Sequence, residues 1–327
     1  MRIDQNPMRI LSLIAALVFA ASAMAQQVYP NRPVRLVVPY VPGGAVDPQA
    51  RMIATKLSER FRQQFLVDNR GGGNTVIGTE VVAKAPADGY TLLWVAPAFV
   101  TTPSLLKQLP YDNIKDFDAV ATVSRTRMVL VLNLAVPANN LKELIALAKA
   151  KPGQLNYASS GVGTGPHLAG ELFNIEAGVK TQHIPYKGSG QLVPDLIAGQ
   201  VQMSFQGVVT VISHIKSGRL KAIVVGGETR VPALPQVPTF VEAGLPGYDR
   251  KDSWHGIVAP AGTPKAIIDQ LSTEIRRILA APDMQVPLAN QGLDPFISTP
   301  AETAALIKAD IARIAGIIKT ANIRLEN

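Results

Sequence analysis

Two glycine-rich segments have the residue types and spacing that bind an anion through the backbone. The first follows a short run of strand-forming residues and reads Pro42-Gly43-Gly44-Ala45-Val46-Asp47-Pro48. Its aspartate suits the cap of a helix, and its second proline suits the first helical position. The start of such a helix attracts a carboxylate or phosphate through unpaired N–H groups and the helix dipole. An ordinary capped turn is the alternative interpretation, because glycine-rich turns are common.

The second segment also lies between a predicted strand and a predicted helix, and it reads Ser159-Ser160-Gly161-Val162-Gly163-Thr164-Gly165-Pro166-His167. Its hydroxyl groups add donors to those of the backbone, and we expect the two loops to face each other. Neither loop has the G-x-G-x-x-G spacing or the Gly-Lys-Ser/Thr ending of nucleotide sites. We interpret His167 as a capping or packing residue, because no carboxylate or nucleophile forms a recognisable motif with it.

The chain lacks the residue patterns that mark common catalytic or metal sites. It has no G-x-S-x-G or H-E-x-x-H sequence, and its histidines lie far apart, at His167, His183, His214 and His255. We therefore predict no catalytic residue, no metal site and no cofactor, and a protein that is not an enzyme. A secreted α/β hydrolase and a scaffold protein without a small ligand are the alternatives. Substrate turnover would reveal the first, and a lack of stabilisation by any carboxylate would reveal the second.

The charge balance weakly favours an anionic ligand and argues against nucleic acid. Lysine and arginine number 32 against 24 acidic residues, a net charge of +8. The basic residues are dispersed, with no run of five or six and no helix-turn-helix or zinc-finger spacing. The chain has no cysteine. An exported protein of this length must then depend on hydrophobic burial rather than on disulfides.

Residues 1–25 have the pattern of a secretory signal peptide. Arg2 and Arg9 precede an apolar run, Leu11 to Ala21, which ends in Ala23-Met24-Ala25. We predict cleavage after Ala25 and export from the cytoplasm. A single membrane helix is the alternative, but it needs about 20 apolar residues and this run is shorter.

Strand-forming runs alternate with helical repeats along the remaining chain, which predicts an α/β protein with parallel-rich sheets. The predicted strands are Val34–Val38, Leu66–Val67, Thr91–Val95, Met128–Leu132, Leu155–Ala158, His183–Ile184, Val201–Phe205, Leu220–Val225 and Trp254–Ala259. The predicted helices are the repeat from Ala50 to Phe65, Asn74–Lys84, Leu141–Ala150, Leu168–Ala177, Leu192–Ala198, Pro264–Leu279 and Pro300–Lys319.

The length of the chain suits two domains. We expect lobe 1 to comprise residues 26–126 and 254–327, and lobe 2 to comprise residues 127–253. The chain would leave lobe 1 near Arg125 and return to it near Ser253. Two such crossovers predict a hinge beneath an interdomain cleft.

Short motifs occur along essentially the whole mature chain. They are Tyr29-Pro30 with Pro33, Val37-Val38-Pro39, Pro42-Gly43-Gly44 with Asp47, Asp88-Gly89-Tyr90-Thr91-Leu92, Leu109-Pro110-Tyr111-Asp112, Lys115-Asp116-Phe117, His167-Leu168-Ala169-Gly170-Glu171-Leu172-Phe173, Pro185-Tyr186-Lys187-Gly188, Glu242-Ala243-Gly244-Leu245-Pro246-Gly247-Tyr248 and Ala259-Pro260-Ala261-Gly262-Thr263-Pro264. In combination these motifs are highly specific, and they resemble the Bug family, the receptors of tripartite tricarboxylate transporters.

This resemblance implies a type II periplasmic binding protein fold, in which two lobes close on a carboxylate held mainly by backbone N–H groups and bridging waters. The residues that match the family's contact loops are Gly43, Gly44, Ala45 and Asp47 on one side and Ser159, Gly161, Gly163 and Thr164 on the other. We also expect Tyr40 to contribute to the site, and Ala98 and Phe99, in the loop after the third strand, to line the side of the pocket.

Two further predicted site residues bear on the identity of the ligand. Gln206 stands where many relatives of this family have aspartate, so a ligand ammonium group would find no negative partner here and would be costly to bury. The resemblance therefore implies a dicarboxylate or an aromatic carboxylate rather than an amino acid. His255 stands where tyrosine is frequent, and it could donate a hydrogen bond to a polar substituent or pack beside Trp254.

Together these observations predict a periplasmic receptor that binds a small carboxylate by closure around Arg127 and Ser253. The resemblance implies that membrane permease subunits of a tripartite tricarboxylate-type transporter are its partners. We expect the chain to act as a monomer. An orphan receptor with a signalling role is a further alternative.

Overall fold

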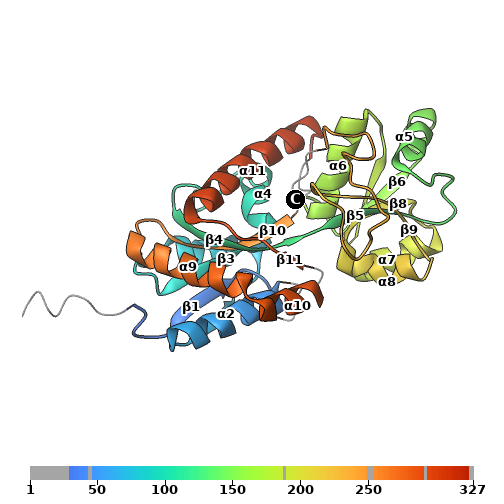
Figure 1. Ribbon diagram of the computed structural model, residues 1–327. Coiled ribbons are helices and arrows are strands. Elements are labelled where there is room, and N and C mark those ends of the chain that lie inside the picture. Colours follow the sequence, from blue (N-terminus) through green and yellow to red (C-terminus); the bar gives the residue numbers. More distant parts are fainter. Residues whose placement is uncertain (1–28, 43–45, 187–188, 249–252, 291–292, 324–327) are drawn as a thin grey trace, which may run out of the picture.

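The computed structural model describes residues 29–42, 46–186, 189–248, 253–290 and 293–323, which form two α/β lobes side by side (Figure 1). Each lobe is built on one β-sheet with helices on both faces. The predicted signal peptide and the predicted contact residues Gly43, Gly44 and Ala45 lie outside the described residues.

The first sheet has the strand order β11–β4–β10–β3–β1–β2. Its strands are β1 (Val34–Val38), β2 (Phe65–Asn69), β3 (Thr91–Val95), β4 (Phe117–Thr126), β10 (Ser253–Pro260) and β11 (Leu293–Pro295). β1 pairs in parallel with β2 and β3, whereas β10 runs antiparallel to β3 and β4. Most side chains of β1 are buried, as expected for a central strand that is covered on both faces.

The second sheet has the strand order β7–β6–β8–β5–β9. Its strands are β5 (Met128–Leu132), β6 (Asn156–Ser159), β7 (Gln182–Pro185), β8 (Met203–Gly207) and β9 (Lys221–Val225). β6 pairs in parallel with β7 and β8, and β5 runs antiparallel to β8 and β9. Both sheets are therefore mixed, with a parallel part made of strand–helix–strand units.

Helices flank both sheets, and none of those described is long and apolar enough to cross a membrane. In the first lobe they are α2 (Asp47–Phe61), α3 (Val76–Ala83), α4 (Pro97–Leu105), α9 (Lys265–Ala280), α10 (Pro282–Asn290) and α11 (Pro300–Thr320), with a short 3₁₀ turn at Gly73–Thr75. In the second lobe they are α5 (Leu141–Ala150), α6 (Gly165–Ala177), α7 (Ser189–Ala198) and α8 (Val208–Lys216).

The chain crosses between the two sheets in two places. β4 leads into β5 with only Arg127 between them, and the chain re-enters the first sheet at Ser253, the first residue of β10 (Figure 1). Because β10 comes back from the second lobe, it enters the first sheet in the direction opposite to β3 and β4. This return explains why the first sheet is mixed rather than wholly parallel.

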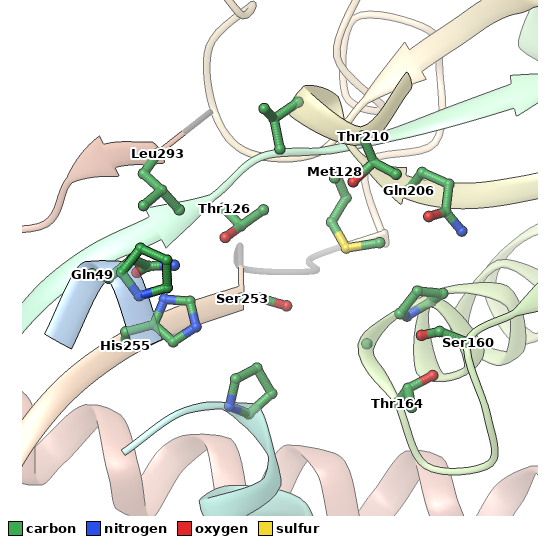
Figure 2. Close-up of a pocket in the computed structure, with 16 residues that line it drawn as sticks. Gln49, Thr126, Met128, Ser160, Thr164, Gln206, Thr210, Ser253, His255 and Leu293 are labelled. Atoms are coloured by element: carbon green, nitrogen blue, oxygen red, sulfur yellow. The ribbon is translucent and has the colours of Figure 1, made fainter. Parts of the chain in front are cut away.

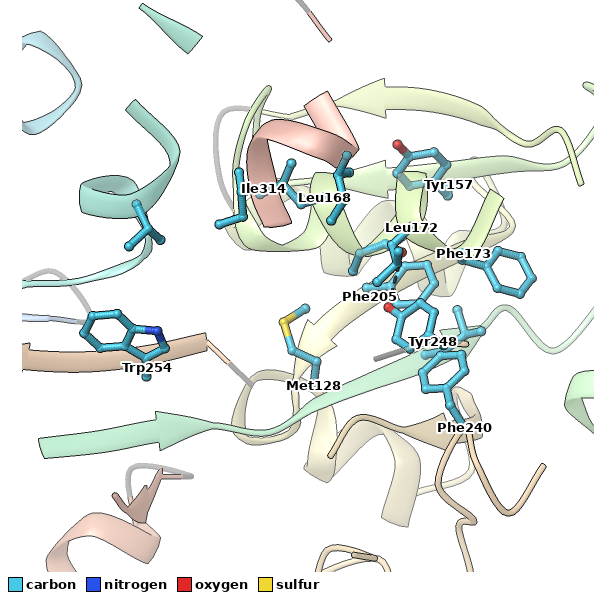
Figure 3. Close-up of a cluster of buried hydrophobic side chains, with 14 of the residues drawn as sticks. Met128, Tyr157, Leu168, Leu172, Phe173, Phe205, Phe240, Tyr248, Trp254 and Ile314 are labelled. Atoms are coloured by element: carbon cyan, nitrogen blue, oxygen red, sulfur yellow. Dashed lines mark hydrogen bonds between the residues drawn. The ribbon is translucent and has the colours of Figure 1, made fainter. Parts of the chain in front are cut away.

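One buried apolar cluster extends across both lobes. It includes Ile314 of α11 and Leu168 of α6, which lie close together in Figure 3, and it continues to a set of stacked aromatic rings in the second lobe. The rings of Phe240 and Tyr248 stack with centroids 3.6 Å apart. Helix α11 thus connects the lobes along one side of the molecule, in addition to the two crossovers.

Several element bounds differ from the predictions. Phe65 begins β2 instead of extending α2, because the left-handed backbone of Arg62, with φ of 54°, ends that helix. Ala98 and Phe99, expected in a loop, belong to α4, whose internal Pro103 and neighbouring threonines mask its helical repeat. β4, α8, α10 and β11 have no counterpart among the predicted elements.

Candidate ligand-binding site

A pocket of about 480 Å³ lies between the lobes, and its polar side chains converge on a common space (Figure 2). Residues from both sheets and from the helices that follow them line it. They are Pro48, Gln49, Pro97, Thr126, Ser253, His255 and Leu293 from the first lobe, and Met128, Ser160, Thr164, Gly165, Pro166, Gln206, Gly207, Val209 and Thr210 from the second.

Four of the described helices begin at the wall of this pocket. The first or second residue of each one lines it: Pro48 of α2, Pro97 of α4, Gly165 of α6 and Val209 of α8. The first-turn N–H groups of a helix have no partner within that helix, and its dipole places partial positive charge there. Two helix starts from each lobe therefore direct positive potential at one cavity.

Side chains do not cap these four helix starts. The residues at their N-cap positions, none of which makes a side-chain capping hydrogen bond, are Val46, Ala96, Thr164 and Gly207. Away from the pocket, Asn140 caps α5 and a Thr299–Glu302 capping box caps the start of α11, whereas α3 and α9 have no side-chain cap. The N–H of Val208 donates to the carbonyl of Arg127 and that of Phe99 to the carbonyl of Ala96, and Pro48, Pro97 and Pro166 have no N–H. The other first-turn donors at the pocket are left to water or to a ligand.

No charged side chain is found among the described residues that line the pocket. The polar side chains of the lining are neutral amides, hydroxyls and one imidazole, and the remainder are mainly proline, valine, leucine and methionine. Within the described lining, positive potential therefore comes from backbone dipoles and not from lysine or arginine side chains.

His255 lies on β10 with 6 % of its surface exposed, and its ring faces the pocket (Figure 2). Its Nδ1 atom lies 3.2 Å from the hydroxyl of Ser124, and that hydroxyl donates to Oε1 of Gln49 at 3.0 Å. The indole of Trp94 packs beside the ring, with centroids 6.2 Å apart. Burial lowers the pKa of His255 to about 4, so the imidazole is neutral at pH 7.

Gln206 lies on β8 and lines the pocket, although only 1 % of its surface is exposed. Its amide nitrogen donates to the hydroxyl of Ser204 at 2.8 Å, and that hydroxyl donates to the carbonyl of Ala158. The amide is thus held in place by the neighbouring strand β6.

Internal hydrogen bonds fix the shape of the second predicted loop. Gly163 donates its N–H to Nδ1 of His167 at 2.9 Å, and Thr164 donates its hydroxyl to the carbonyl of Gly161 at 2.7 Å. Ser159 is fully buried, and its hydroxyl lies 2.6 Å from Nε2 of His183. Of this loop, Ser160, Thr164, Gly165 and Pro166 line the pocket, so Thr164 is the one predicted contact residue of the loop in the lining, and Ser159, Gly161 and Gly163 are not part of it.

Asp47, in the described part of the first predicted loop, stabilises the pocket wall but does not line the pocket. The carboxylate of Asp47 accepts hydrogen bonds from Asn69 and Arg51, both at 2.9 Å, and ties the start of α2 to β2. The following residues, Pro48 and Gln49, line the pocket in its place. Tyr40 packs against the core of the first lobe, and burial raises the pKa of its phenol.

The expectation for Ala98 and Phe99 needs correction. Both residues belong to helix α4 rather than to a loop, and Pro97 lines the pocket at this point. Phe99 is 3 % exposed and packs edge-on against Phe117, with ring centroids 5.4 Å apart. Its side chain is therefore part of the core.

Several lining residues come from the places where the chain changes lobes. Thr126 and Met128 flank Arg127 at the first crossover, Ser253 is the first residue after the second crossover, and Leu293 belongs to the short strand β11. The predicted crossovers could have identified the first three of these lining residues. β11 has only three residues and no distinctive pattern. Among the described residues, no group of three or more metal-ligating side chains comes together.

Comparison with known proteins agrees with this architecture. The family described as tripartite tricarboxylate transporter family receptor matches residues 49–323. Protein BugT of Bordetella pertussis is 36 % identical over 327 residues, which cover 98 % of this chain and 100 % of BugT.

Two solved structures from Rhodopseudomonas palustris are also similar. Rpa4515 with adipate is 35 % identical, covers 90 % of this chain and 99 % of its own, and superposes with a TM-score of 0.76. MatC with bound malate is 29 % identical, covers 89 % and 100 % respectively, and has a TM-score of 0.72. The resemblance to the Bug family and the periplasmic binding protein fold are both confirmed: the chain belongs to the tripartite tricarboxylate transporter receptor family, a family of solute-binding receptors.

Proposed function

We propose that this receptor captures a small carboxylate in the pocket between its lobes and presents it to a tripartite tricarboxylate-type transporter. The observation that carries the proposal is the convergence of four helix starts without side-chain caps on a pocket whose described lining has no charged side chain. Such backbone donors suit a carboxylate, whose oxygens accept several hydrogen bonds at once. A cation would meet the positive ends of the helix dipoles and, in the described lining, no anionic side chain.

The size and lining of the pocket suit a small organic acid. A volume of about 480 Å³ leaves room for such a molecule and for bridging waters. The two related structures contain adipate and malate, which are both dicarboxylates. Gln206 presents an amide rather than a carboxylate, which supports the prediction of a dicarboxylate or aromatic carboxylate over an amino acid.

Closure of the lobes is the mechanism that we propose for capture. We assign residues 26–126 and 254–327 to lobe 1 and residues 127–253 to lobe 2, with the hinge at Arg127 and Ser253. Arg127 is buried at the first crossover, where it donates to Asp294 of β11 at 2.8 Å and reaches the carbonyl of Gly226 in the second lobe at 3.4 Å. Its guanidinium thus joins both lobes at the point where rotation would occur.

The proposed partners are the membrane permease subunits of the transporter, with the receptor acting as a monomer in the periplasm. This location requires residues 1–25 to act as a cleavable leader. Cell fractionation with N-terminal sequencing tests the leader, and a periplasmic chain that begins at Gln26 is the expected result. A full-length chain retained in the cytoplasm would contradict the assignment.

The serine–histidine contact in the described pocket wall does not have the geometry that a hydrolase needs. Ser124 approaches Nδ1 of His255, but Ser124 is fully buried behind the ring and does not line the pocket. Its hydroxyl also donates to Gln49, so it is held away from any bound molecule.

A thermal-shift screen of the mature chain tests the proposed function. The panel consists of aliphatic dicarboxylates, tricarboxylates and aromatic carboxylates, each paired with its carboxamide as a matched neutral control. A ligand at 100 times its dissociation constant stabilises the fold by about 2.7 kcal/mol, and we expect this from at least one acid and not from its amide. Equal stabilisation by acids and amides, or by neither, would overturn the proposal.

A further inference from the structure

The hydrogen bonds behind His255 have a defined direction. A serine hydroxyl carries a single hydrogen, and that of Ser124 is given to Oε1 of Gln49, at 3.0 Å. The Ser124 oxygen is then an acceptor toward Nδ1 of His255, which lies 3.2 Å away. Nδ1 must therefore carry the proton of this contact.

A neutral imidazole has one N–H group, so the proton on Nδ1 leaves Nε2 with a lone pair. Burial holds the pKa of His255 at about 4, which keeps the ring neutral at physiological pH. Among the described residues, no group hydrogen-bonds to Nε2, although the residue is only 6 % exposed and lines the pocket. The wall thus presents a buried acceptor whose partner has to come from within the pocket.

We propose that Nε2 of His255 selects a carboxylate that also carries a hydroxyl group, by accepting a hydrogen bond from that hydroxyl. This inference rests on the proposed function and names the class of acid that the same pocket prefers. It reverses the polarity expected from the sequence, in which His255 would donate to the ligand.

The carboxylate and the hydroxyl group of such a ligand would bind at different places in the pocket. A carboxylate accepts hydrogen bonds and would be repelled by the lone pair on Nε2, so it binds at the helix starts instead. The carbon skeleton between the two groups would lie against apolar lining such as Pro97, Met128 and Leu293. An unpaired acceptor buried in this wall disfavours a ligand that offers it no donor.

Titration calorimetry with matched acids tests the inference on the unmodified mature chain. The probes are malate against succinate, and 3- and 4-hydroxybenzoate against benzoate and the corresponding methoxybenzoates. We expect the hydroxylated member of at least one set to bind about tenfold more tightly than the member without a hydroxyl, which is the contribution of one buried hydrogen bond. The methoxy compounds have an oxygen but no donor, and they should not regain the difference.

The variant His255→Phe and nitrogen NMR provide two further tests. In His255→Phe the ratio of the affinities for the hydroxylated and the unhydroxylated acid should fall to about one, whatever the change in either affinity. Long-range nitrogen–proton spectra should show His255 protonated at Nδ1 and unprotonated at Nε2, a result that does not depend on any ligand.

The possible outcomes distinguish this inference from the proposed function. Acids that bind equally well with and without a hydroxyl, or a proton found on Nε2, would overturn the inference and leave carboxylate capture standing. A failure of every acid to bind would overturn the proposed function, and the inference with it.

Discussion

His167 and His183 stack face to face, with ring centroids 3.8 Å apart and ring planes 9° apart, and both rings hold the loop that leads into α6. Nδ1 of His167 accepts the N–H of Gly163, and Nε2 of His183 lies 2.6 Å from the hydroxyl of Ser159. Burial, with a smaller effect of the charge on His183, lowers the pKa of His167 to about 3, and burial lowers that of His183 to about 4. The loop is therefore supported by two neutral rings.

The first prediction is that acid destabilises the protein through this pair. Both pKa values lie below the unfolded value of about 6.5, so the unfolded chain takes up protons that the folded chain does not. The contribution of the pair is complete above pH 6.5 and is lost as the pH falls toward 4. Glu171 lies 3.9 Å from His167 and bonds to Tyr157, so it offers only limited compensation for a new charge.

Urea unfolding at pH 7.5 and pH 5 measures this effect. The wild-type chain should lose on the order of 1 to 2 kcal/mol for each of His167 and His183 between these pH values. His255, whose pKa is also lowered by burial, should add a similar loss in the wild type and in the variant. His167→Asn retains an acceptor for Gly163 and removes one titrating group, so its loss should be smaller. An identical pH dependence in the wild type and the variant would contradict the prediction.

The second prediction concerns Gly170, in the middle of α6. A Cβ atom built on this residue would lie 2.2 Å from the ring of Tyr157, which is fully buried and cannot move aside freely. Gly170→Ala should destabilise the fold by about 1 to 3 kcal/mol, although alanine is the better helix former.

Gly316→Ala is the matched control for Gly170→Ala, because Gly316 is also helical and has no atom within 4 Å of an added Cβ. It should stabilise the chain by up to about 1 kcal/mol. Thermal or urea unfolding of both variants measures the contrast, and equal effects of the two substitutions would refute the clash.

The third prediction concerns the absence of charge at Gln206. Gln206→Glu places a carboxylate of nearly the same shape in the pocket wall, where it would repel the bound acid at short range. Carboxylate affinity at pH 7 should fall at least about tenfold. Gln154→Glu makes the same change at an exposed position before β6 and should leave the affinity unaltered. Titration calorimetry with the best acid of the panel compares them.

Local sequence patterns were sufficient to predict the bounds of some helices but not of others. The bounds predicted for α5 agree with the structure because a capping asparagine precedes the helix and Lys151-Pro152-Gly153 follows it. For α4 and α8 the local signal is weak, since both helices are short and rich in β-branched residues. Their formation depends on packing within their own lobes, of α4 against α11 and of α8 against β8, which no local pattern encodes.

Local sequence patterns likewise predicted some residues of the site and missed others. Thr164, Gln206 and His255 follow or occupy recognisable strands, and all three line the pocket as placed by the structure. Ser253 and Leu293 reach it only because β10 and β11 join the first sheet beside β4, a pairing between segments more than 100 residues apart. The direction of the hydrogen bonds at His255 also requires the positions of Gln49 and Ser124, which only the folded chain brings together.

The fourth prediction concerns Asp310, which links α11 to the strand that returns from the second lobe. Asp310 is 3 % exposed; one carboxylate oxygen accepts the indole N–H of Trp254 at 2.7 Å, and the other accepts Arg313 at 2.9 Å. Its neighbour on the helix, Ile314, packs in the cluster that continues to Leu168 of α6. Removal of the carboxylate leaves a buried indole donor and a partly buried cation without their acceptor.

Asp310→Ala should therefore lower the free energy of unfolding by about 3 kcal/mol. Arg313→Ala should cost only about 1 kcal/mol, since the Arg313 side chain is 27 % exposed and the Trp254 bond survives. Urea unfolding followed by tryptophan fluorescence measures both, because Trp254 is one of two tryptophans in the chain. If the two variants are destabilised equally, the indole hydrogen bond contributes little, and the stability of this junction must come from the apolar contacts of α11 alone.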